Sequence, residues 1–285
     1  MILETENNLN PTALSIATQA ETEHTLYAEP IWQNKYFTIT NSMINAWIVV
    51  LIVLAISLAL RRKIKLIPTG LQNYFETVVE AALNLADSVT GNRAKTLKFF
   101  PICFALFIFV LINNWLGILP GVGSVGFNMV EEGHTVFVPL FRGGTADLNT
   151  TLALALFAVI GSNVAGAIFV GTWNYLNKFI NIKAFLAIPG KFLKDPTIIL
   201  VNPIKAFVGV VEIIGEIAKV ASLSFRLFGN IFAGEVLLAS MAALFAFVVP
   251  IPFMFLEIIV GLVQALIFSV LTLVYLTIAT TKEEH

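Results

Sequence analysis

Residues 206–249 read AFVGVVEIIGEIAKVASLSFRLFGNIFAGEVLLASMAALFAFVV, one long apolar pattern that contains no proline. As a continuous helix this segment would measure about 66 Å at ~1.5 Å per residue, whereas the hydrocarbon core of a bilayer is about 30 Å thick. The segment therefore either breaks near Gly229 and Asn230 or crosses the membrane at a steep slant. We expect the slant, because it keeps the charged residues before Ser222 near the membrane surface.

The chain then turns at VPIP, residues 249–252, and continues into a second apolar helix over residues 253–281. This helix would measure about 43 Å at ~1.5 Å per residue, so it needs tilt as well. Residues 203–281 thus predict two long, strongly tilted C-terminal helices, and these are the candidates for an ion path.

The composition places the chain in a membrane. Of its 285 residues 58% are hydrophobic and only 12% are charged, and the mean hydropathy is +0.87. A soluble domain of this length would carry about twice the charge and no apolar runs of ~20 residues. A net charge of −1 gives no basic surface for nucleic acid. The three histidines lie outside the apolar runs, and we expect no metal site and no cofactor.

Further apolar runs predict an all-α integral membrane protein with about five crossings. The first run covers residues 43–60 and ends in a basic cluster that begins at Arg61. Residues 71–89 place apolar and acidic side chains on opposite sides of a helix, which predicts an amphipathic helix on the membrane surface. The next crossings fall at about 99–119 and 148–175, separated by a glycine-rich loop. Six crossings are the alternative.

The distribution of lysine and arginine predicts the orientation. Seven of these residues fall in 61–98 and five in 176–205, but only one each in 1–42 and 120–147. Loops rich in Lys and Arg stay on the cytoplasmic side. We therefore expect residues 1–42 to form an external arm, residues 43–285 to form the polytopic membrane domain, and the C-terminus to be cytoplasmic.

Charged and amide side chains inside these helices are the candidates for function, because a charge in a crossing helix costs roughly 2.5 to 3.5 kcal/mol. Arg226 is the clearest case, since no acidic residue lies within one helical turn of it. Helical periodicity places Glu235 on the opposite face. The residues that share the face of Arg226 are Glu212, Glu216, Lys219, Ser222 and Asn230, and those that share one face of the returning helix are Glu257, Gly261, Gln264 and Tyr275.

Structural interpretations of these residues stay open at this point. Arg226 fits a side chain that snorkels to the membrane surface or pairs with a carboxylate elsewhere in the bundle. Glu212 and Glu216 fit a solvated cytoplasmic face. Gln264 and Asn230 fit simple hydrogen bonds between helices.

Two segments resemble the a subunit of F-type ATP synthases: SLSFRLFGNIFAGE at 222–235 and QALIFSVLTLVYL at 264–276. Weaker support comes from NNWLGILP at 113–120 and TADLNTTLALAL at 145–156. The resemblance covers the chain from about residue 100 onward. It implies a stator subunit of the bacterial plasma (inner) membrane that is not catalytic alone and that conducts H⁺ or Na⁺.

The same resemblance implies roles for individual residues. In that family the motif arginine, here Arg226, faces the essential carboxylate of a rotating c-ring and separates two offset aqueous half-channels. The implied partners are the c-ring, the peripheral-stalk b subunits and the membrane lipid. The position of Glu257 is histidine in some bacterial members, so the outer path here has two carboxylates and no imidazole. The family channel positions are Glu235, Glu257, Gln264 and Asn230, with Asn114, Asp147 and Asn149 nearer the outer entrance.

Two other classes of function fit the sequence less well. A secondary transporter would usually show repeated halves with interrupted helices, and we find no internal repeat. An intramembrane hydrolase would need a nucleophile with a base or a motif such as H-E-x-x-H, and the sequence contains none. The coupling ion and the size of the ring stay open.

Overall fold

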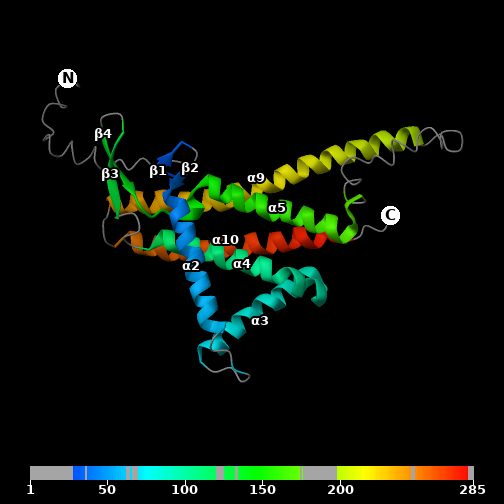
Figure 1. Cartoon of the computed structure of the whole chain (residues 1–285), viewed down its shortest axis with the longest axis horizontal. Helices are drawn as coiled ribbons and strands as arrows, with labels where there is room; N and C mark the ends of the chain where they lie inside the picture. Colours follow the sequence, from blue (N-terminus) through cyan, green and yellow to red (C-terminus); the bar gives the residue numbers. More distant parts are fainter. Residues whose placement is uncertain are drawn as a thin grey trace, which may run out of the picture.

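The computed structural model describes residues 28–35, 37–61, 65, 70–119, 125–131, 134–173, 175, 198–244 and 248–281 (Figure 1). Its helices are α2 (Asn41–Arg61), α3 (Leu71–Thr90), α4 (Arg93–Ile118), α5 (Leu148–Val170), α9 (Ile198–Leu244) and α10 (Pro250–Ala279), and a short 3-10 helix, η3 (Gly144–Ala146), precedes α5. Among the described residues, five helices are long and apolar enough to cross a membrane: α2, α4, α5, α9 and α10. The prediction of an all-α membrane protein with about five crossings and one amphipathic helix, α3, is confirmed.

The segment that decides the fold forms a single helix. α9 runs through Gly229 and Asn230 without interruption, so the alternative of a break at these residues is wrong. The helix starts at Ile198 and not near residue 206, and its 47 residues span about 70 Å at ~1.5 Å per residue. A helix of this length fits a bilayer only at a slant. Figure 1 shows that α2 runs across the direction that α4, α5, α9 and α10 share.

α10 lies at the centre of the bundle, where it packs against α4, α5 and α9. α9 also packs along α5, and α3 packs against α4 and α10. The main apolar core includes Leu223 and Leu227 of α9, which are 2% and 1% exposed. The outward faces carry large exposed apolar side chains such as Ile168, which is 73% exposed. This distribution is typical of helices that contact lipid.

The structure contains two β-hairpins that the sequence analysis did not predict. The first pairs β1 (Pro30–Asn34) with β2 (Phe37–Thr40), and the second pairs β3 (Gly126–Glu131) with β4 (His134–Pro139). Figure 1 shows both hairpins near the same end of α2. The first hairpin belongs to the predicted external arm, of which residues 1–27 lie outside the described residues. The side of the membrane on which the arm lies stays a prediction.

Side-chain hydrogen bonds tie the start of α2 to the rest of the bundle. The amide of Asn41 donates to the carbonyl oxygen of Pro139 in β4 at 3.2 Å. The hydroxyl of Ser42 donates to the carboxylate of Asp147, the residue before α5, at 3.0 Å. Residues far apart in the sequence thus meet at this end of the bundle.

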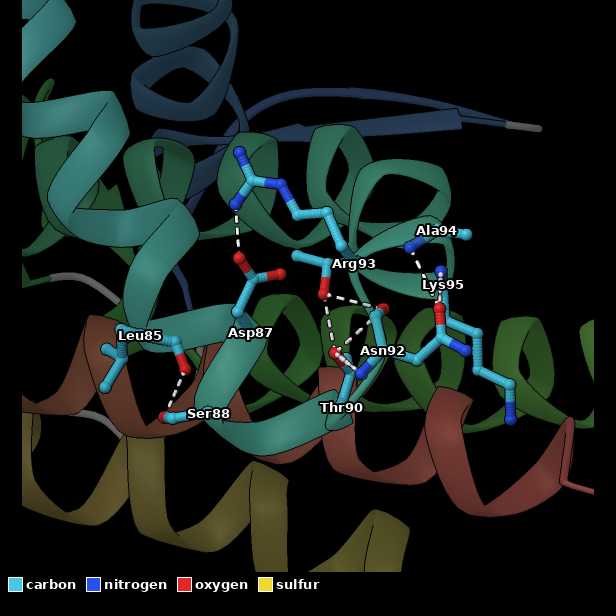
Figure 2. Close-up of polar contacts among 9 residues, drawn as sticks. Leu85, Asp87, Ser88, Thr90, Asn92, Arg93, Ala94 and Lys95 are labelled. Atoms are coloured by element: carbon cyan, nitrogen blue, oxygen red, sulfur yellow. Dashed lines mark hydrogen bonds and ion pairs between the residues drawn. The ribbon is translucent and has the colours of Figure 1, made fainter.

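A tight turn joins α3 to α4, and Figure 2 shows it in detail. Gly91 ends α3 with φ of 62°, a left-handed conformation that glycine adopts without steric cost. Asn92 then caps α4, because its side-chain oxygen accepts from the backbone N–H groups of Ala94 at 2.9 Å and Lys95 at 3.3 Å. Beside the turn, Arg93 forms an ion pair with Asp87 of α3, so the turn is held by both backbone and side-chain contacts (Figure 2).

Candidate ion path

Arg226 lies on the outward face of α9. Its side chain is exposed, whereas the neighbouring Leu223 and Leu227 point into the core. Nη2 of the guanidinium lies 3.4 Å from Oγ of Ser222, one turn earlier, and Asn230, one turn later, is also exposed. Within the part of the chain that the structure describes, no carboxylate lies within 4.0 Å of this guanidinium. Among the described residues, Arg226 therefore forms no ion pair inside the bundle.

Glu235 forms a shielded ion pair that the sequence analysis missed. Nε of Arg142, a side chain that is 9% exposed, lies 3.6 Å from Oε2 of Glu235, which is 19% exposed. Oε1 of the same carboxylate packs against the backbone at Gly143, where an added Cβ would lie 3.0 Å from it. One signal was available in the sequence, because Arg142 is the one lysine or arginine of segment 120–147.

Glu257 faces α9 from α10. Its side chain is 7% exposed and lies directly against Gly234 of α9, where any added Cβ would collide with the carboxyl group. Among the described residues, Oε1 of Glu257 has no hydrogen-bond partner. Gly261 and Gln264 are buried on the same side, so this part of the predicted polar face of α10 points into the bundle.

Asn114 and Asp147 form hydrogen bonds at the end of the bundle that contains Glu235 and Glu257. Asn114 donates to the carbonyl oxygen of Gly261 at 2.9 Å and accepts from the hydroxyl of Thr145 at 2.6 Å. Asp147 caps α5 by accepting from the backbone N–H of Asn149 at 3.1 Å, and it is 3% exposed, whereas Asn149 itself is exposed. These contacts give Asn114 and Asp147 structural roles, and the place of all three residues in an ion path stays a prediction.

A second polar cluster joins α5, α9 and α10. Nζ of Lys219 lies 2.7 Å from Oε1 of Glu216 and 5.2 Å from the centre of the Tyr275 ring. The amide of Asn163 in α5 donates to Oε2 of Glu216 at 3.1 Å. The hydroxyl of Tyr175 donates to the side-chain oxygen of Asn163. Sequence reasoning missed Asn163 and Tyr175, because neither is charged and neither belongs to a motif.

The first cluster consists of Glu235, Arg142 and Glu257, and the second is built around Glu216 and Lys219. The two clusters are offset along α9, with Arg226 between them. Glu216 lies ten residues before Arg226 and Glu235 nine residues after it, which corresponds to ~15 Å and ~14 Å along the helix axis. Glu212, one turn before Glu216, is half-buried at the same end. Groups that bind and release protons, or replace the water around a small cation, therefore occur at two separate levels of the bundle.

A bundle of long apolar helices with charged and amide side chains inside it is typical of a membrane protein that moves ions. The family model described as "ATP synthase A chain" matches residues 43–277. The chain belongs to this family, so it is an ion-translocating subunit of the Fo sector of ATP synthase. It is a multi-pass protein of a bacterial membrane, it takes part in ATP synthesis, and it is not catalytic alone.

Relatives along nearly the whole chain agree with this assignment. "ATP synthase subunit a" of Trichlorobacter lovleyi is 30% identical over 245 residues, which cover 86% of this chain and 89% of the relative. The protein of the same name from Syntrophobacter fumaroxidans is 34% identical over 230 residues, or 80% of each chain. That from Mycobacterium bovis is 32% identical over 251 residues, with 86% and 89% covered.

The close contact between Gly234 and Glu257 yields a first prediction. Gly234→Ala should displace the Glu257 carboxyl group, because the added Cβ has no room beside it, and ion uptake by membrane vesicles should fall several-fold. Gly215→Ala is the matched control in the same helix, since a Cβ there meets nothing within 4 Å, and it should keep normal uptake. The measurement is ATP-driven ion uptake per assembled complex. Equal rates in the two variants would count against a functional position for Glu257.

Proposed function

We propose that this subunit is the stator half of the ion path and that Arg226 faces the essential carboxylate of a rotating c-ring. The observation that carries the proposal is the exposed guanidinium on an apolar helix, with no carboxylate within 4.0 Å among the described residues. A permanent charge in this position must meet water or an anion, because an unpaired charge in hydrocarbon is costly. A ring carboxylate is a partner of the opposite sign.

The proposed chemistry follows from this charge. An opposite charge within ~4 to 6 Å favours the ionised form of a carboxyl group, so a protonated ring carboxyl group that reaches Arg226 releases its proton. A Na⁺ bound to the ring carboxylate leaves because the guanidinium repels it and takes its place. The same fixed cation blocks direct passage of ions between the two clusters. Arginine suits this role because its guanidinium does not deprotonate in proteins.

The two polar clusters are then the ends of two offset half-channels. We assign the cluster of Glu235, Arg142 and Glu257, together with Gln264, to the outer half-channel. The cluster at the other end of α9 belongs to the inner half-channel: Glu212, Glu216, Lys219 and Tyr275, with Ser222 and Asn230 next to Arg226. Asn114, Asp147 and Asn149 lie toward the outer entrance.

In this assignment the two hairpins lie outside and the C-terminus lies in the cytoplasm, which agrees with the lysine and arginine counts. The remaining partners are the peripheral-stalk b subunits, which would hold this subunit still while the ring turns. Each charge that crosses the membrane releases about 2.3 kcal/mol per 100 mV, and the barrier at Arg226 couples this energy to rotation.

Substitution of Arg226 tests the proposal. Arg226→Ala should abolish ATP synthesis and coupled pumping while the complex still assembles, and it should raise passive proton permeability, because the barrier between the half-channels is lost. Arg226→Lys should also fail, since an ammonium lacks the planar fork and sheds its proton more readily when desolvated. ATP synthesis and passive permeability are measured in membranes with equal amounts of assembled complex.

The matched control is Arg61→Ala, which removes an exposed arginine at the end of α2 and should leave synthesis unchanged. Substantial synthesis by the Arg226→Ala complex would refute the mechanism. Loss of the subunit from the membrane in this variant would instead indicate a structural role for the arginine.

The two acidic residues of the outer cluster yield a further prediction. Glu235→Gln and Glu257→Gln should each slow ion flux several-fold, because the other carboxyl group continues to carry ions. The double variant should lose at least tenfold more than either single variant, a difference of about 1.4 kcal/mol or more in the barrier. Flux is followed as ATP-driven acidification with and without Na⁺. Small and additive effects would show that both residues are structural.

A further inference from the structure

A cavity of about 380 Å³ lies where α4 begins and α10 ends. Three helices form its walls. It is lined by Asn92, Ala94, Lys95, Lys98, Phe99, Phe169 and Thr280.

Two lysines give this cavity a positive charge. Nζ of Lys98 lies 4.0 Å from the centre of the Phe169 ring, and Nζ of Lys95 lies 3.1 Å from the hydroxyl oxygen of Thr281. Across the described part of the chain, no carboxylate lies within 4.0 Å of either ammonium group. The nearby carboxylate of Asp87 is already paired with Arg93, and Figure 2 shows Lys95 extending away from that pair.

Two backbone N–H groups at the start of α4 already have hydrogen-bond acceptors. The N–H groups of Ala94 and Lys95 donate to the side chain of Asn92, as Figure 2 shows. An anion that enters the cavity would therefore be held by the lysine side chains. The positive end of the α4 helix dipole would add a weaker attraction.

The other walls of the cavity are apolar. The rings of Phe99 and Phe169 meet edge to face at 5.7 Å. The surface beside them is also apolar, since Leu97 is 55% exposed and Ile168 is 73% exposed. Two ammonium groups next to a lipid-facing apolar surface suit a ligand with an anionic head and a hydrocarbon tail better than they suit free phosphate.

We propose that this cavity binds the headgroup phosphate of an anionic glycerophospholipid, whose acyl chains lie along the apolar surface beside Phe169. Lys95 and Lys98 pair with the phosphate, and Phe99 and Phe169 line the entrance for the first methylene groups. The bound lipid joins the α3–α4 turn to the ends of α5 and α10. The inference is independent of the proposed ion path.

Photo-crosslinking of the assembled complex tests the lipid site. The probes are phosphatidylglycerol and phosphatidylcholine with the same photoreactive acyl chains, and the labelled peptides are mapped by mass spectrometry. Phosphatidylglycerol should label residues 92–99 and 166–170 about five- to tenfold more than phosphatidylcholine, because each nearby lysine strengthens binding of an anionic lipid. Equal labelling by the two lipids in the unmodified complex would overturn the proposal.

Variants and a competitor identify the groups that bind the lipid. Lys95→Gln with Lys98→Gln should abolish the preference for phosphatidylglycerol, whereas the control pair Lys35→Gln with Lys65→Gln, which removes the same charge elsewhere, should keep it. A preference that survives the first pair, or is lost equally in both, would contradict the site. Displacement of the label by millimolar inorganic phosphate would also contradict it, by indicating a free-phosphate site.

Discussion

A permanent positive charge in the middle of an apolar helix is the constraint on which the rest of this structure depends. Arg226 does not lose its charge, so it must meet either water or an anion. The fold turns it outward, because Leu223 and Leu227 on the same turns pack into the core against α5 and α10. Two carboxylates of the same helix are paired elsewhere, Glu216 with Lys219 and Glu235 with Arg142. Under the proposed mechanism this charge stays available for a partner subunit.

The length of α9 is the second constraint, since a helix of 47 residues is more than twice as long as the hydrocarbon core of a bilayer is thick. We expect this mismatch to tilt the helix in the bilayer. The spacing of the polar residues along α9 separates the two clusters, with Arg226 between them. Under the proposed mechanism this separation is what forces an ion to travel with the ring and not straight through the subunit.

Local patterns predicted much of this architecture. Hydropathy located α2, α4, α5, α9 and α10 because each buries its own backbone polar groups and needs only an apolar exterior. Polar residues at helical spacing located Arg226. The hairpins and the Arg142–Glu235 pair escaped prediction, because they depend on contacts between segments far apart in the sequence. A single arginine in a loop does not reveal which of several carboxylates it will meet. Asp147 caps α5 through a contact that is local in the sequence, but the sequence analysis did not predict this role.

Cross-linking to the ring tests the central claim most directly. Cysteines at Ser222 or Asn230 are paired with a cysteine next to the essential carboxylate of the ring subunit, in membranes that contain the assembled complex. The native Cys103 is 3% exposed in the core, so it adds little background. We predict rapid disulfide formation from both positions and none from a cysteine at Ile217, which is 65% exposed on the opposite face of α9. Cross-links from Ile217 alone, or from none of the three positions, would show that Arg226 does not face the ring.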